Sequence, residues 1–157
     1  MSNIPLSESG RKLKKLLQTR AVFLDGAMGT LVQREKLSEA DFRRGLPELE
    51  SNEISQLGNN DILNLTRPDI IAKINRAYYN VGSDIVTTGT FGANLLVQSE
   101  YGNGEDLVRR MNARAVEIAK AEAAEASARL GGKELFVAGS IGPMNKSASI
   151  SADVEDP

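Results

Sequence analysis

The chain has 157 residues, the size of about one domain, and it contains neither cysteine nor histidine. It therefore forms no disulfide, offers no Cys or His ligand for zinc, copper or iron, and has no histidine general base. Its charges nearly balance, with 19 Lys and Arg against 21 Asp and Glu, so nothing indicates a nucleic-acid or acidic-membrane partner.

Residues 1–20 are expected to form a lead-in helix. Basic and apolar residues alternate from Arg11 to Lys15, most simply as the solvated face of an amphipathic helix. This segment lacks the continuous apolar core of an export signal. Apolar runs elsewhere, such as residues 21–24, are far shorter than the roughly 20 residues that span a bilayer. We expect a soluble, cytoplasmic protein without a membrane partner.

Three short apolar runs each lead into a loop rich in Gly, Thr or Ser. They are residues 21–29, 84–90 and 135–142. Continuous apolar runs of this length, punctuated by Gly, predict strands that are buried on both faces of a parallel sheet.

Two longer segments have helical periodicity. The first is expected to start with Thr66 as its cap and Pro68 in its first turn, and to end at Gly82. Its predicted apolar face consists of Ile70, Ile71, Ile74, Ala77, Tyr78 and Val81. The second runs from about residue 105 to 130, stops at Gly131 and Gly132, and carries an apolar stripe of Leu107, Val108, Met111, Ala115, Ile118 and Ala119.

The alternation of strands and helices predicts an α/β fold built from βαβ units with right-handed crossovers. Residues 30–64 depart from it: they form a long polar excursion, with a short helix expected at 38–42, and such segments are usually functional or disordered. Three parallel strands cannot close a barrel, so the architecture is predicted to be incomplete.

The segment Leu24–Thr30 is the most informative candidate site. Asp25 ends the first predicted strand, where parallel α/β folds place their ligand sites, and small residues follow it. A carboxylate beside accessible backbone amides suits a zwitterion, with Asp25 holding an ammonium group and the amides meeting a carboxylate. The alternative is a capped turn in which Asp25 bonds nearby amides. The spacing of Gly26 and Gly29 does not fit a dinucleotide-binding loop.

The ends of the other two runs carry further polar side chains. Hydroxyls between Thr87 and Thr90 suit either a ligand or the loop's own amides, and Phe91 is expected in the core rather than as a stacking platform. Lys146, after the third run, is predicted to be a solvated surface residue, with an anion contact as the alternative. Tyr78 and Tyr79 are expected to pack in the core or at its rim.

Several segments in this order resemble one family. They are residues 25–30 (DGAMGT), 58–63 (GNNDIL), 66–71 (TRPDII), 84–91 (DIVTTGTF) and 137–146 (VAGSIGPMNK), continuing to Ser149–Ser151. Over residues 12 to 157 the chain resembles the opening of the N-terminal homocysteine-binding domain of cobalamin-dependent methionine synthases, within the homocysteine S-methyltransferase family.

This resemblance implies that residues 21–157 are the first part of a (β/α)8 TIM barrel, about three parallel strands with intervening helices. In the family, zinc held by three cysteines activates the sulfur of homocysteine, which takes a methyl group from methylcobalamin. Methyltetrahydrofolate regenerates the cobalamin on a separate domain. Carried over by position, Asp25 would meet the homocysteine ammonium, and backbone groups of Gly26, Ala27 and Thr88 would contact the amino-acid end.

The chain also departs from the family pattern. Ala27 stands where Gly is usual, a mild change if its φ is negative, and Thr87 and Gly89 replace a typical Glu and Asn. The zinc cysteines, and an acidic residue that assists amino-group binding, would lie beyond Pro157. We therefore expect no catalytic residue, metal ligand or cofactor in this chain, which alone should be inactive. The alternatives are a homocysteine methyltransferase with another methyl donor, or a non-catalytic fragment that binds amino acids or self-associates.

Overall fold

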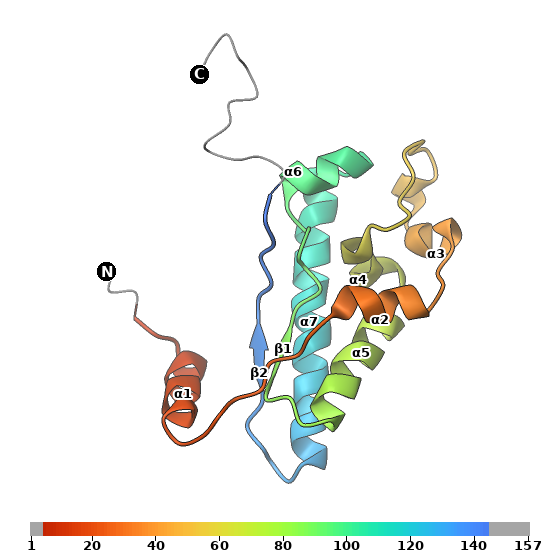
Figure 1. Ribbon diagram of the computed structural model, residues 1–157. Helices are drawn as coiled ribbons and strands as arrows, with labels where there is room; N and C mark the ends of the chain where they lie inside the picture. The colour runs from red at the N-terminus through yellow and green to blue at the C-terminus, as the bar shows by residue number, and fades with distance from the viewer. Residues whose placement is uncertain (1–4, 145–157) are drawn as a thin grey trace.

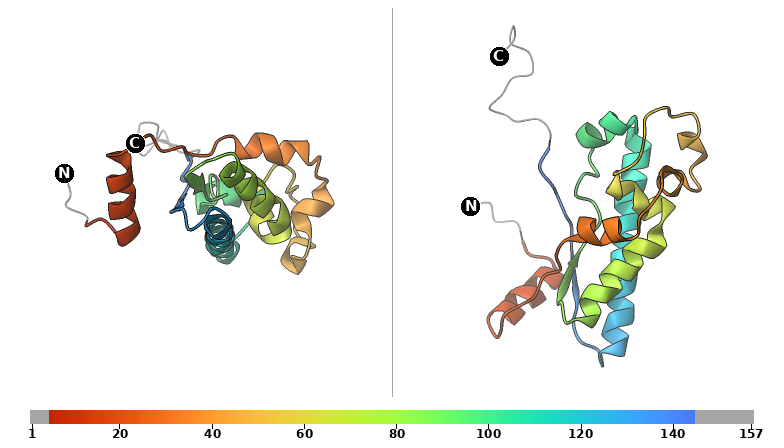
Figure 2. Two further views of the ribbon diagram at one scale, coloured as in Figure 1. Left: turned by 90° about the horizontal axis from the view of Figure 1, so that it is seen from below. Right: turned by 45° about the vertical axis from the view of Figure 1, so that its right-hand side comes forward.

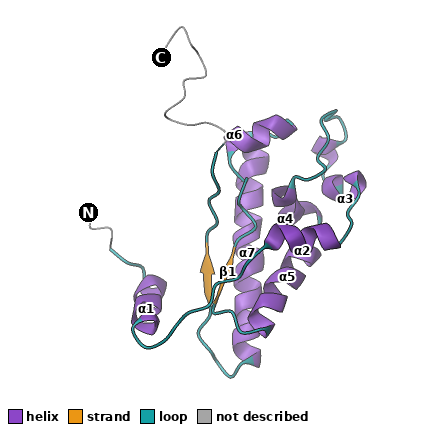
Figure 3. Cartoon of the chain, viewed as in Figure 1, coloured by secondary structure: helices purple, strands orange, loops and turns teal. Residues whose placement is uncertain are grey.

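The computed structural model describes residues 5–144, and this part of the chain is mostly helical (Figure 3). The α-helices are α1 (Glu8–Leu17), α2 (Met28–Arg34), α3 (Glu39–Arg43), α4 (Leu63–Thr66), α5 (Pro68–Asn80), α6 (Leu95–Gln98) and α7 (Glu105–Arg129). Three short 3-10 helices are η1 (Pro47–Leu49), η2 (Asn60–Ile62) and η3 (Ser99–Tyr101), and the strands are β1 (Ile85–Thr87) and β2 (Phe136–Ala138). Among the described residues, no helix combines the length and apolar character needed to cross a bilayer.

The three predicted strand runs lie side by side and parallel, but the first is barely a strand. β1 pairs with β2 in parallel, with Ile85 opposite Phe136. Leu24 joins the other side of β1 through a single parallel bridge to Ile85. The α/β class with parallel pairing is therefore confirmed, whereas the described residues contain two strands and one bridge instead of three strands. The complete (β/α)8 barrel stays a prediction.

Only one face of this small sheet is covered. Val86 of β1 is fully buried in a cluster with Tyr79 of α5 and Ala119 of α7, and these two helices lie together on one side of the strands (Figure 2). On the first run, Phe23 and Leu24 are 64% and 56% exposed. The prediction that this run is buried on both faces is wrong for the described chain, because no second layer covers it.

A single residue, Arg67, separates helix α5 from α4, and α5 does not begin at a threonine cap. Thr66 is the last residue of α4, and its hydroxyl donates to the Ile62 carbonyl at 3.4 Å, so its predicted role as a cap is wrong. Arg67, with φ −138° and ψ 56°, separates the two helices because a residue before proline is driven out of the helical region. Gly82, with φ +106°, follows the end of α5 as predicted.

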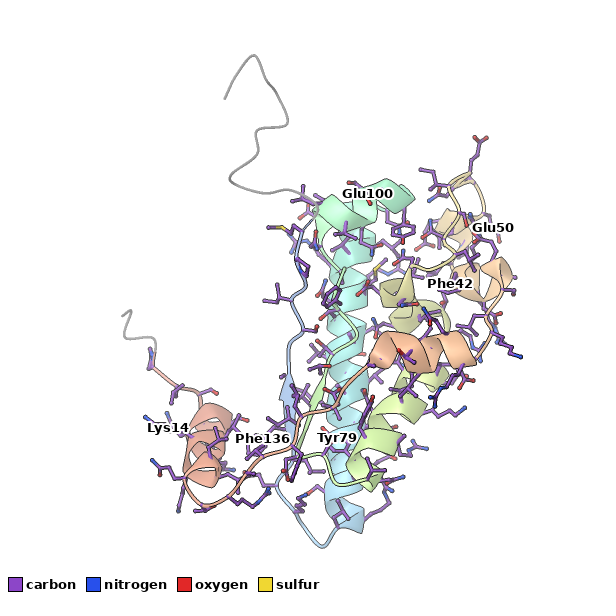
Figure 4. All side chains as sticks on the ribbon, in the orientation of Figure 1. Lys14, Phe42, Glu50, Tyr79, Glu100 and Phe136 are labelled. Carbon is purple, nitrogen blue, oxygen red and sulfur yellow. The ribbon has the colours of Figure 1, made fainter. Side chains whose placement is uncertain are left out.

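The apolar face of α5 is rotated at its C-terminal end relative to the prediction. Ile70, Ile71 and Ile74 are buried as expected, but Val81 is 81% exposed. Tyr79 takes its place in the core at 1% exposure, and its hydroxyl donates to the Phe136 carbonyl at 2.9 Å (Figure 4). This bond fastens the helix to β2 and confirms a core position for Tyr79.

Helix α7 is the longest element and matches its prediction. All six residues of the predicted stripe are buried, and the helix packs along α5, α4 and β2 (Figure 1). Gly131 and Gly132 follow it with φ of +70° and +86°, a backbone region that side chains other than glycine rarely adopt.

The excursion at residues 30–64 is ordered and belongs to the same core. Ser38 and Asp41 form a capping box that starts α3, which confirms the short helix expected there. Phe42 and Leu49 are buried in one apolar cluster with Ile62, against α5 and α7. Helix α1, by contrast, buries none of its residues and stands apart from the sheet, and basic side chains such as Lys14 face solvent as predicted (Figures 1 and 4).

Asp84 fastens the strand runs together where they begin. Its fully buried carboxylate accepts two hydrogen bonds from Arg20, both at 2.8 Å, and forms an ion pair with Lys133 at 2.8 Å. The Phe23 N–H adds a bond at 3.0 Å. The hydrogen bonds from Arg20 outweigh desolvation and hold the pKa of this carboxyl well below its usual range. The contacts of Asp84 thus hold the N-terminal ends of the strand runs together. A ligand site is therefore expected at the opposite, C-terminal ends.

Candidate functional site

A cavity of about 460 Å³ lies at the C-terminal end of β1. Three segments meet there: the turn after the first run, the loop into η2 and the loop after β1. Its lining residues are Gly26, Met28, Gly29, Gly58, Asn59, Asn60, Asp61, Thr87, Thr88, Gly89, Phe91, Gly92, Val97, Tyr101 and Ser140. A more open groove of about 840 Å³, between residues 48–54 and 102–110, contains none of the predicted site residues. The smaller cavity is the better candidate because ligands of parallel α/β folds bind at the carboxyl ends of strands.

Asp25 does not itself line this cavity, but β1 fixes it directly before Gly26, which does. Its N–H donates to the Ile85 carbonyl at 3.0 Å. Its Oδ2 accepts the N–H and the hydroxyl of Thr87, at 2.8 and 3.0 Å. The partner is 62 residues away, so the carboxylate is not the cap of a local turn. Oδ1 has no hydrogen-bond partner among residues 5–144 and is available to a ligand.

Gly26 and Ala27 supply free donors next to this carboxylate. Within the described part of the chain, neither backbone N–H has a hydrogen-bond partner, and Gly26 lines the cavity. Ala27 has a negative φ, −41°, which meets the condition under which alanine in place of the usual glycine is a mild change. The Tyr78 hydroxyl lies 3.6 Å from the position that a Cβ on Gly26 would take.

Thr88 lines the cavity, but its N–H, carbonyl and hydroxyl all have hydrogen-bond partners within the described chain. Its N–H donates to the Ala138 carbonyl at 2.9 Å, and its hydroxyl accepts the Ser140 N–H at 3.0 Å. The hydroxyls of Thr88 and Thr90 are 2.7 Å apart, and Thr90 donates onward to the Ser140 carbonyl. These two hydroxyls therefore bond each other and the backbone of Ser140 in the segment after β2, instead of the loop's own amides.

Phe91 does not join the core. It is 62% exposed and lines the cavity, so the core prediction is wrong. The residue follows the strand instead of lying in it, and its carbonyl accepts the Gly142 N–H at 3.0 Å. This bond joins the loop after β1 to the segment after β2. Lys146 lies outside the described residues.

Asp61 is a site residue that the sequence did not identify. It lines the cavity, and its Oδ1 accepts the Gly92 N–H at 3.0 Å. Burial raises the pKa of its carboxyl to about 6. The run Asn59-Asn60-Asp61 is visible in the sequence as a polar triplet, but only the fold brings it to the loop after β1.

Four buried amide side chains form the wall behind Asp61. Asn59 and Gln98 exchange two bonds, at 2.9 and 3.0 Å, and Asn103 donates to Gln98 and to Gln56 at 2.9 and 3.0 Å. All four are at most 3% exposed. The cluster ties the 30–64 excursion to the segment before α7, and one of its members, Asn59, lines the cavity.

Proteins similar to this chain in sequence or in fold are homocysteine methyltransferases. A family model described as homocysteine S-methyltransferase matches residues 22–156. The homocysteine methyltransferase MmuM from Escherichia coli is similar in structure: its metallated form has a TM-score of 0.64 and 24% identity, over 83% of this chain and 41% of that one. Its oxidized form has a TM-score of 0.65 and 23% identity, over 83% and 40%. These identities support the fold alone, and the chain spans about two fifths of the length of the structures that it matches.

Proposed function

This chain belongs to the homocysteine S-methyltransferase family, and we propose that its cavity at the end of β1 binds the amino-acid end of homocysteine. The observation that carries the proposal is the set of free groups at residues 25–27. One carboxylate oxygen of Asp25 and two adjacent backbone N–H groups have no partner among the described residues. An anionic acceptor beside two donors complements an α-ammonium and an α-carboxylate.

The bonds from Thr87 hold Asp25 ready for this role. Because Oδ2 already accepts two hydrogen bonds, the carboxylate cannot rotate without losing them. Since the carboxylate is planar, fixing Oδ2 also fixes the position of Oδ1. A receptor that is fixed before the ligand arrives loses little conformational entropy on binding. The chain would therefore orient homocysteine by its amino-acid end and leave its thiol toward the rest of the cavity.

The finer proposal is that this site belongs to a cobalamin-dependent methionine synthase, which the sequence of residues 58–63 favours over simpler homocysteine methyltransferases. Thiol activation in that enzyme needs zinc, and the residues of this chain do not fit zinc. The chain has no cysteine or histidine, and residues 5–144 hold no group of three acidic side chains placed for a metal. We propose that zinc, cobalamin and methyltetrahydrofolate act through parts of a larger (β/α)8 enzyme outside these residues.

Calorimetric titration with L-homocysteine tests the amino-acid site directly. We expect binding by the wild-type chain, and binding about 10- to 100-fold weaker in Asp25→Asn, because a charged hydrogen bond contributes about 1.5–3 kcal/mol. Asp106→Asn, at an exposed carboxylate far from the cavity, is the matched control and should bind like the wild type. Equal affinity for the analogue of homocysteine that lacks the amino group would contradict the proposal.

A further inference from the structure

The loop after β1 is held at three backbone atoms by side chains from outside it. The Asn64 amide donates to the Gly89 carbonyl at 2.6 Å, and the Gln98 amide donates to the Gly92 carbonyl at 3.1 Å. Between these two contacts, Asp61 accepts the Gly92 N–H at 3.0 Å. Asp61 is the one charged member of this clamp, and its backbone carbonyl also accepts from the Asn64 amide at 2.7 Å.

Gly92 is shaped for the close approach of this carboxylate. A Cβ placed on Gly92 would lie 2.8 Å from Asp61 Oδ2, a distance that real Cβ atoms do not reach. The carboxyl group of Asp61 therefore lies directly against the backbone of the loop, and the same residue lines the cavity. Any change in its hydrogen bonding is transmitted to the loop that carries Thr88 and Phe91.

We propose that Asp61 is a positioning residue whose ionised carboxylate holds the loop at residues 88–92, most of which line the cavity, in place beside the proposed amino-acid site, so that ligand binding strengthens as Asp61 loses its proton. This inference rests on the proposed function of the same cavity. Ionised acceptors form shorter and stronger hydrogen bonds than neutral ones, so protonation weakens the hold on the Gly92 N–H.

Few other titratable groups share this environment. Tyr101, from η3, is the only other titratable residue in the lining, and no cation lines the cavity within the described residues. Asp25 is not among the lining residues, and its carboxylate is bonded to Thr87. With no counter-charge nearby, burial is the leading cause that raises the pKa of Asp61 to about 6, so its proton is exchanged between about pH 5 and pH 7.

Two variants separate charge from hydrogen bonding. Asp61→Asn keeps an oxygen that accepts the Gly92 N–H but cannot titrate, and Asp61→Ala removes the acceptor. Asp106→Asn, an exposed carboxylate outside the cavity, is the matched control. L-methionine is the probe, because it has no thiol that titrates.

The first readout needs no ligand: the amide proton shift of Gly92, followed by NMR against pH. In the wild type and in Asp106→Asn it should titrate with a midpoint near pH 6, and in Asp61→Asn it should not. In Asp61→Ala, hydrogen exchange at Gly92 should quicken by at least about threefold. A Gly92 amide that ignores pH in the wild type overturns the proposal.

The second readout is the affinity for L-methionine at pH 5 and pH 7.5. We expect the wild type to bind about fivefold more tightly at the higher pH, and Asp61→Asn to lose that gain. The same pH dependence in Asp61→Asn overturns the Asp61 proposal alone. No binding by the wild type at either pH overturns the proposed function, and with it the role of Asp61 in binding.

Discussion

Asp25 and Asp61 are two carboxylates beside one cavity, and their surroundings give them different tasks. Asp25 accepts two hydrogen bonds from Thr87 through one oxygen and keeps the other free. Asp61 accepts one backbone N–H and lies in a site that disfavours its charge. The first is built as a fixed receptor, and the second as a group whose charge responds to pH near neutrality.

The environment of Asp61 has a consequence for stability. Its pKa is about 6 in the folded chain and near 3.9 in an unfolded one, so ionisation disfavours the folded state. Relative to Asp61→Asn, the wild type should therefore lose stability as the pH rises from 4 to 7.5, by about 2 kcal/mol. Urea denaturation of both proteins at the two pH values measures this difference.

An Asp61→Asn variant whose advantage does not grow with pH would show that Asp61 is not buried as described. Asp84 has the opposite effect. Because its pKa is lowered in the folded chain, its ionised carboxylate stabilises the fold above about pH 4, and this stabilisation is lost in acid. Since Asp84 is present in both proteins, its contribution cancels in the comparison.

At the scale of elements, helix α7 supports the sheet and the excursion together. Its buried face meets α4, α5 and β2, and Met111 on that face is fully buried. Replacing Met111 with Ala should lower the free energy of unfolding by about 2–5 kcal/mol, because a cavity remains where the side chain was. Val116→Ala, on the same helix at 37% exposure, is the control and should cost less than about 1 kcal/mol.

Chemical denaturation of these two variants gives the comparison. Equal losses in both would mean that α7 does not pack with the face assigned to it. The predicted stripe of this helix was correct because periodicity over 25 residues leaves one consistent apolar face.

The short elements show where sequence reasoning stopped. The strands were located by their apolar runs, but the first run pairs through a single bridge and stays exposed at Phe23 and Leu24. Burial of a strand depends on the layer above it, which no local pattern encodes. Thr66 was mistaken for a cap because a preceding short helix, α4, ends at the same residue.

Local sequence likewise predicts only part of the candidate site, because some of its residues depend on contacts between distant segments. Position at a strand end singles out Asp25, and the family resemblance adds Gly26, Ala27 and Thr88; of these four, Gly26 and Thr88 line the cavity, and the binding roles stay predictions. Asp61 was missed because its role depends on a contact 31 residues along the chain, with Gly92. Phe91 was assigned to the core on hydrophobicity, although a residue just beyond a strand end lies at the rim of the sheet.

At the scale of the whole molecule, the stabilising ion pairs and the proposed binding cavity lie at opposite ends of the strands. Asp84, Arg20 and Lys133 lie where the strand runs begin, and the cavity lies where they end. Phe23 and Leu24 of the first run are exposed in the described chain. A larger barrel, as proposed, would enclose such residues, since the interior of a (β/α)8 barrel is filled by strand side chains.

The proposal that zinc acts through other residues makes a prediction for this chain. Without Cys or His, the chain should bind zinc with an affinity weaker than micromolar and should not methylate homocysteine. Calorimetry with zinc, and methionine analysis after incubation with methylcobalamin and homocysteine, test the two statements. Submicromolar zinc binding, or methionine formed above the level without protein, would refute them.

The most direct test of the central claim is an NMR titration that maps where an amino acid binds. Addition of L-homocysteine to the labelled wild-type chain should shift the backbone amides of Gly26 and Ala27 first, together with Thr87, which is bonded to Asp25. In Asp25→Asn those shifts should need about tenfold more ligand or more. Saturable shifts confined to other regions, such as the groove between residues 48–54 and 102–110, would contradict the account.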